Sequence, residues 1–151
     1  MTVSSEVRLV TTTARPTAVV VAATTWQEFP SLWGRLLDQV YECLATIDPR
    51  DRLHNVMLYK DDLPTVEVGV EVHVPFTPTG DVVASTLPAG PAAMAVHRGP
   101  YDRLGETHDA VWEWCKKNQR RPAGPRWEIY GDWHEDPSQL VTEVYYLLSP
   151  G

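Results

Sequence analysis

The chain has 151 residues, of which 43% are hydrophobic and 22% charged, so it can build the core of one domain and is not disordered throughout. Its 20 acidic and 13 basic residues give a formal net charge of -7 without a basic run, which argues against nucleic acid as a partner. Two cysteines are too few for a disulfide framework or a cysteine-based zinc site.

The first half of the chain predicts a strand, a helix and two further strands. A β-branched run at residues 17–24 predicts the first strand. Apolar residues then recur at helical spacing over residues 29–44. We place the helix start near Pro30, which suits a first turn, rather than at the competing capping signal of Thr25 and Glu28. Pro49 ends the helix, and the remaining two segments are expected as strands at residues 55–59 and 65–74.

The second half repeats this order of elements. It predicts a strand at 92–97, a helix at 104–118, a loop at 120–125 and strands at 126–131 and 139–148. Short extra strands are expected before each half, at residues 7–10 and 82–85. The second helix is expected to bury one face, made of Leu104, His108, Val111, Trp112 and Cys115.

An offset of 75 residues relates the two halves, since it places Pro16 on Pro91 and Val21 on Val96. Identities are sparse, so the shared order of elements is the stronger argument. We expect an α+β fold made of a duplicated strand-helix-strand-strand module, with antiparallel sheets and two helices packed on one side. Each half alone is too small for a secure core, so residues 1–151 are predicted to be a single domain with pseudo-repeats at about 5–75 and 80–148.

The chain carries no sign of secretion or membrane insertion. Residues 1–6 lack the basic start and apolar stretch of a signal peptide, and the longest apolar run, residues 18–23, is far below the ~20 residues of a membrane span. We therefore expect a cytoplasmic protein that binds neither nucleic acid nor membranes.

Glu143 is the first candidate for chemistry. It lies in the last predicted strand, whose two faces are both mostly apolar, so this strand is expected to be central and covered on both sides. An ionised carboxylate buried there costs several kcal/mol, on the order given for buried charges, unless it has a partner. Glu143 is therefore either a buried anion that awaits a ligand, or a structural residue at a sheet edge or beside Arg126 or Arg98.

The neighbouring strand offers a second carboxylate. Glu128 and Tyr130 share one face of that strand, and Trp127 and Ile129 share the other. One of these pairs lies beside Glu143 in a hairpin with the last strand, but the sequence does not fix the register. Glu128 either joins the site or is a solvated residue beside an aromatic ladder.

Aromatic side chains form the rest of the candidate site. Six Trp and six Tyr against two Phe is a mix that favours binding surfaces, since Trp and Tyr combine apolar rings with polar groups. Tyr101 precedes the second helix, Trp112 lies on it, and Trp33 lies on the first helix; each is either a core residue or part of a ring-lined ligand site. The five histidines lack metal-binding spacing, and no nucleotide-binding motif is present, so we expect no metal and no cofactor.

The order of these motifs resembles the GyrI-like family of small-molecule-binding, or effector-binding, domains. The resemblance covers nearly the whole chain. The matching segments are Val7 to Val21, Val96-His-Arg-Gly-Pro-Tyr101 with Leu104, Trp112-Glu-Trp114, Trp127-Glu-Ile-Tyr130, Asp136-Pro137 and Thr142-Glu-Val-Tyr145. This sequence departs from the family pattern at residues 17–23 and at Trp26, whose counterparts vary widely in the family and bear on the first half of its ligand groove.

The resemblance implies a groove between the two halves that binds bulky, lipophilic and often cationic molecules, lined by rings and a buried glutamate. The implied ligand-binding residues are Glu143, Tyr145, Glu128, Tyr130, Tyr101, Trp112 and Trp33. A stand-alone member of this kind would sequester or sense such molecules. Some similar stand-alone members hydrolyse cyclopropane-containing toxins, and in that case Glu143 or Glu128 would act as the base and Tyr145 as the proton donor. A third reading is a protein that docks on gyrase.

Overall fold

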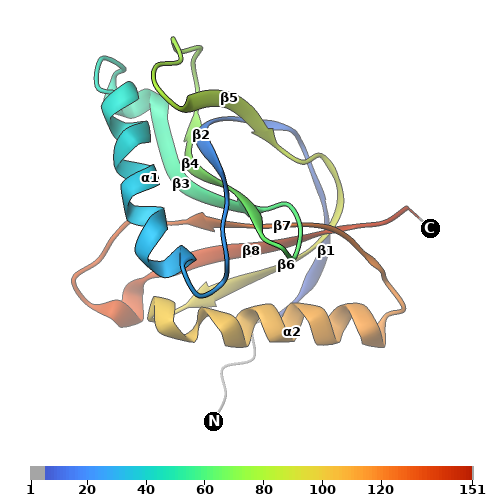
Figure 1. Ribbon diagram of the computed structural model, residues 1–151. Helices are drawn as coiled ribbons and strands as arrows, with labels where there is room; N and C mark the ends of the chain where they lie inside the picture. The colour runs from blue at the N-terminus through green and yellow to red at the C-terminus, as the bar shows by residue number, and fades with distance from the viewer. Residues whose placement is uncertain (1–5, 151) are drawn as a thin grey trace.

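The computed structural model describes residues 6–150 and shows one eight-stranded antiparallel sheet with two helices on one of its faces (Figure 1). The predicted α+β class and duplicated module are confirmed. The elements are β1 (Arg8–Thr12), β2 (Arg15–Ala23), α1 (Phe29–Cys43), β3 (Arg52–Tyr59), β4 (Thr65–Val72), β5 (Val82–Leu87), β6 (Gly90–Arg98), α2 (Leu104–Lys117), β7 (Pro122–Tyr130) and β8 (Val141–Leu148). Short 3-10 turns lie at Pro49–Asp51, Tyr101–Arg103 and Pro137–Gln139.

The strand order β1-β6-β8-β7-β3-β4-β2-β5 places the two halves side by side. The first module supplies β3-β4-β2, the second supplies β6-β8-β7, and they meet where β3 pairs with β7. The bounds of β2 and β6, 15–23 and 90–98, differ by the predicted 75 residues. The two extra strands, β1 before the first half and β5 before the second, each pair with the other half. Strand β1 pairs with β6 of the second half, and β5 pairs with β2 of the first. The start of the first predicted pseudo-repeat, residue 5, lies outside the described residues.

Helix α1 packs its apolar face on the first half of the sheet. It begins at Phe29, one residue before the predicted start, with Pro30 in its first turn. Thr25 does not cap this helix; its hydroxyl accepts the Glu28 N–H within the preceding turn. The side chains buried under α1 come from alternate positions of β4, which share one face of the strand: Val66, Val68, Val70 and Val72.

Helix α2 covers the second half, but the face that it buries differs from the predicted one. Its buried residues are Leu104, Thr107, Val111 and Cys115. Trp112 is 47% exposed, so its assignment to the buried face was wrong. The buried stripe runs at spacings of three and four residues, and Trp112 is turned about 100° away from Val111 around the helix.

Two boundaries in the last hairpin also differ from prediction. Strand β7 begins at Pro122 rather than at residue 126, and its pairing with β8 is irregular between Pro122 and Arg126. Gly124, with a positive φ of 122°, allows this irregular stretch. Strand β8 begins at Val141, two residues later than predicted, because the 3-10 turn of Pro137 precedes it.

The β7–β8 register answers the question that the sequence left open. Ile129 pairs with Glu143, and Trp127 with Tyr145. Glu128 therefore lies on the face of the sheet that the helices cover, and Glu143 lies on the opposite face. Within the described residues, no helix has the length and hydropathy needed to cross a membrane.

Replacing Gly69 with alanine should destabilise the protein strongly. An added Cβ at this position in β4 would lie 1.9 Å from the Ala18 carbonyl oxygen of the paired strand β2. We expect a loss of about 3 kcal/mol in the free energy of unfolding, the scale of a severe overpacking change, measured by urea titration. The control is Gly34→Ala in α1, where a Cβ meets nothing within 4 Å. It should raise stability by about 0.5–1 kcal/mol, and equal effects of the two substitutions would contradict the packing described for β2 and β4.

Candidate functional site

A cavity of about 670 Å³ opens between α1, β3, the turn before α2 and the end of β7, so both halves line it. Most of its wall is apolar or aromatic and consists of Phe29, Pro30, Trp33, Leu37, Tyr41, Leu53, Val56, Met57, Tyr59, Tyr101, Leu104, Tyr130 and Trp133. The rest of its lining consists of His54, Asn55, Glu128, Gly131 and Asp132. Such a cavity has the size and lining typical of a site for an organic small molecule.

Glu128 supplies the buried charge of this cavity. It sits in β7, paired with Met57 of β3 and Val144 of β8, and its side chain is 4% exposed. One carboxylate oxygen, Oε1, accepts the hydroxyls of Tyr59 at 2.9 Å and Tyr130 at 2.5 Å. The other oxygen, Oε2, lies 2.6 Å from Nε2 of His108. Three hydrogen bonds thus compensate for the water that this carboxylate has lost.

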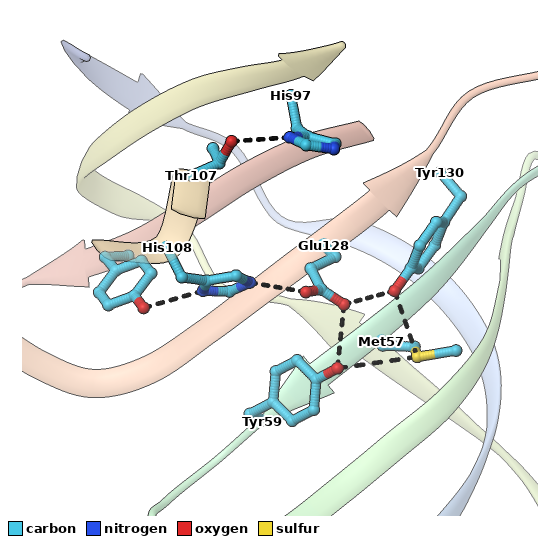
Figure 2. A network of polar contacts seen from close by, with 8 residues as sticks. Met57, Tyr59, His97, Thr107, His108, Glu128 and Tyr130 are labelled. Carbon is cyan, nitrogen blue, oxygen red and sulfur yellow. Dashed lines mark hydrogen bonds and ion pairs between the residues drawn. The ribbon is translucent and has the colours of Figure 1, made fainter. Parts of the chain in front are cut away.

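The two tyrosines on Glu128 are held in their protonated form. Burial raises the pKa of Tyr59 and of Tyr130 well above the ordinary value, and the nearby negative charge of Glu128 raises both further. Each hydroxyl therefore donates its hydrogen to the carboxylate and does not ionise at neutral pH. Both hydroxyls also lie near the Met57 sulfur, at 3.8 and 3.5 Å (Figure 2).

His108 joins this network from α2 (Figure 2). Its Nδ1 lies 2.8 Å from the hydroxyl of Tyr146 on β8. Burial raises the pKa of Tyr146 to about 12, although the positive charge of Arg126 opposes the shift. The hydrogen-bonded chain therefore runs from Tyr146 through His108 to Glu128 and on to the two tyrosines of the cavity.

Arg126 lies beside this network but forms its ion pair outside it. Its guanidinium lies over the rings of Trp26, Tyr59 and Tyr146 at 5.4–5.9 Å. Its NH1 pairs with Asp62 at 2.9 Å. The ion pair of Arg126 is therefore with Asp62 and not with Glu128.

Four of the predicted ligand-binding residues line the cavity: Glu128, Tyr130, Tyr101 and Trp33. The rings of Tyr101 and Tyr130 meet edge to face at 5.6 Å. The structure thus brings one predicted carboxylate together with three predicted aromatic residues. It does so from both halves of the chain.

The other three predicted residues lie elsewhere among the described residues. Glu143 faces away from the helices and accepts the Tyr145 hydroxyl at 2.7 Å. The ring of Tyr145 stacks on Trp127 at 5.2 Å. Trp112 is exposed on α2 and does not line the cavity. A role of these three residues in binding stays a prediction that no contact with the cavity supports.

Tyr59 and His108 are the functional candidates that the sequence did not single out. His108 was assigned to the buried face of its helix, and Tyr59 to the end of a strand, so both signals were present but unspecific. The role of Tyr59 depends on the β3–β7 pairing, which brings it to Glu128, 69 residues away in the chain. The role of His108 depends on how α2 packs beside β7 and β8. Within residues 6–150, no three His, Cys, Asp or Glu side chains are grouped so that they could hold a metal ion.

A model of the GyrI-like small molecule binding domain family matches residues 5–148 of the chain. The crystal structure of the EcmrR C-terminal domain superposes with a TM-score of 0.79 at 17% identity and covers 97% of this chain and 99% of that one. A hydrolase encoded by lin2189 from Listeria innocua has a TM-score of 0.64 at 10% identity, with coverages of 97% and 93%. SAV2435 bound to tetraphenylphosphonium has a TM-score of 0.63 at 13% identity, with coverages of 95% and 94%. No curated protein matches the chain, and at these identities the structural likeness concerns the fold.

The raised tyrosine pKa values predict a loss of stability in alkaline solution. The ordinary tyrosine pKa is 10.0, so above pH 10 the unfolded chain releases protons that folded Tyr59 and Tyr130 retain. Each of these tyrosines should lower the free energy of unfolding by about 1.4 kcal/mol per pH unit in this range. The double variant Tyr59→Phe/Tyr130→Phe should show a correspondingly flatter profile in urea unfolding between about pH 9 and 11.5.

The control for this measurement is Tyr101→Phe, because Tyr101 is 41% exposed at the mouth of the cavity. It should change the alkaline slope much less than the double variant. A double variant with the slope of the parent protein would contradict the shielding described for Tyr59 and Tyr130.

Proposed function

This chain belongs to the GyrI-like family of small-molecule-binding domains, and we propose that its cavity binds bulky, apolar organic cations. The observation that carries the proposal is the Glu128 carboxylate at the wall of an aromatic cavity. We infer that the protein sequesters or senses such molecules.

The cavity matches the apolar part of such a ligand. Its volume of about 670 Å³ lies in the range of sites that enclose drug-sized molecules. Trp33, Tyr101 and Trp133 are partly exposed at its rim, so their rings are available to an incoming ligand. The ring of Tyr41 already meets the Arg52 guanidinium at 5.6 Å. A ring face that meets a desolvated cation contributes roughly 0.5–2 kcal/mol.

The charge of the site supports a cation in particular. The hydroxyls of Tyr59 and Tyr130 donate hydrogen bonds to Glu128 but bring no positive charge to it. Arg126 pairs with Asp62 instead. The tetraphenylphosphonium bound by SAV2435 is a cation of the proposed kind, and that protein shares the fold.

Hydrolysis is the second candidate function, and the contact between Glu128 and the two tyrosines favours it. Glu128 could take a proton from water, whose oxygen would attack a carbon of a strained cyclopropane ring. The electron pair of the broken carbon–carbon bond would leave on the second carbon, to which Tyr130 would deliver its proton. Glu128 would then return a proton to Tyr130. The lin2189 protein, described as a hydrolase, shares the fold.

Binding of tetraphenylphosphonium tests the first candidate and the choice of carboxylate. We expect saturable binding by isothermal titration calorimetry at about pH 8, and at least a tenfold loss of affinity in Glu128→Gln, since the ligand's counter-charge is removed. Glu143→Gln is the matched control, because that carboxylate lies on the opposite face of the sheet and should leave the affinity unchanged. Loss of binding in Glu143→Gln with normal binding in Glu128→Gln would move the site to the other face.

Mass spectrometry of a cyclopropane-containing electrophile incubated with the protein separates binding from hydrolysis. If the protein only binds, the compound is recovered with its mass unchanged at high protein concentration. A gain of one water that Glu128→Gln and Tyr130→Phe both abolish would instead establish the hydrolase. Tyr145→Phe serves as the control, because Tyr145 contacts Glu143 on the far face.

A further inference from the structure

His108 contacts the carboxylate of the site from outside the cavity. Among the described residues, those that line the cavity include Glu128 but not His108. The two oxygens of Glu128 divide their partners accordingly: Oε1 accepts the two tyrosines and Oε2 faces Nε2 of His108 at 2.6 Å. The charge of the imidazole can therefore change without any change in the groups that the ligand contacts.

Both protonation states of His108 fit the hydrogen bonds that surround it. A neutral ring donates its Nε2 hydrogen to Glu128 and accepts the Tyr146 hydroxyl hydrogen at Nδ1, 2.8 Å away. A protonated ring donates at both nitrogens, and the Tyr146 oxygen then accepts. Neither state leaves a ring nitrogen without a partner, so the network accommodates the extra proton.

His108 also has access to solvent that Glu128 lacks. Its side chain is 19% exposed, against 4% for the carboxylate. Because His108 does not line the cavity, its exposed part lies outside the cavity. Protons can reach the imidazole while a ligand fills the cavity.

The other ionisable groups around His108 are few. Glu128 and Arg126 come from β7 and Tyr146 from β8, and Tyr59 and Tyr130 lie beyond the carboxylate. The Arg126 guanidinium lies over the ring of Tyr146, 5.9 Å from its centroid. On α2 itself, Asp109 and Cys115 act on Tyr146. His97, the nearby histidine of β6, is engaged with Thr107 and the Pro100 carbonyl. Glu128 is therefore the charge in direct contact with the imidazole.

We propose that His108 determines the charge of the ligand that the cavity accepts. This inference rests on the proposed function of the same site. With a neutral imidazole, the Glu128 carboxylate gives the site a net negative charge and favours a cation. With an imidazolium, the pair is internally neutralised, so the preference for a cation is lost.

Two ions of the same shape and opposite charge test this proposal. Tetraphenylphosphonium and tetraphenylborate are titrated against the protein at about pH 8 and about pH 5.5, which bracket ordinary histidine titration. For the parent protein we expect the affinity for the phosphonium to fall about tenfold or more at the lower pH, and the affinity for the borate to rise.

The decisive variant is His108→Gln. Glutamine can still donate an amide N–H to Glu128, as Nε2 of His108 does, but it cannot take up a proton. The ratio of the two affinities should then stay within about twofold between the two pH values. His54→Gln is the control for the histidine at the rim, which pairs with Asp132, and it should keep the pH dependence of the parent protein.

The outcomes separate the two proposals. If the phosphonium binds at about pH 8 through Glu128 but the parent shows no pH dependence, or His108→Gln shows the same dependence, the role of His108 is overturned and the proposed function stands. If neither ion binds the parent protein at either pH, the proposed function fails and the inference fails with it. If the pH dependence of the two affinities is lost in His54→Gln but kept in His108→Gln, the titrating group is His54 at the rim of the cavity, and the role of His108 is overturned.

Discussion

A carboxylate withdrawn from water requires hydrogen-bond donors from the protein, and the site is organised around this requirement at Glu128. Tyr59 of β3, Tyr130 of β7 and His108 of α2 converge on its two oxygens. A buried anion with one partner missing would cost several kcal/mol, on the scale of a broken buried pair, so these three side chains are held in place together. The residues that stabilise the charge thereby also shape the wall that a ligand meets.

The duplicated architecture supplies these donors from both halves. Because β3 and β7 are the equivalent strands of the two modules and pair with one another, the middle of the sheet is also the contact between the halves. Helix α1 and the turn before α2 both border this contact on the same face of the sheet, and both line the cavity. The cavity lies at this contact, and residues of both halves line it.

Most of the fold could be predicted from the sequence, because β-branched runs, helical spacing and proline positions act locally. The candidate site was only partly predictable. Side chains alternate across a strand, so a shift of one residue in the β7–β8 register exchanges Glu128 for Glu143. The turn length needed to fix that register cannot be read from the sequence, because the connection between Tyr130 and Val141 contains a 3-10 turn at Pro137. Tyr59 acquires a role only through the β3–β7 pairing, and His108 only through the packing of α2 against the sheet.

The crossed attachment of β1 and β5 has a consequence for how such a protein could have arisen. The leading strand of each half pairs with a strand of the other half. In a lone half, both this strand and the sheet edge that normally receives the other half's strand would therefore be unpaired. Two separate copies of such a half could pair these strands only by exchanging them in a dimer. The present chain is therefore consistent with an ancestral twofold-symmetric dimer whose subunits became fused.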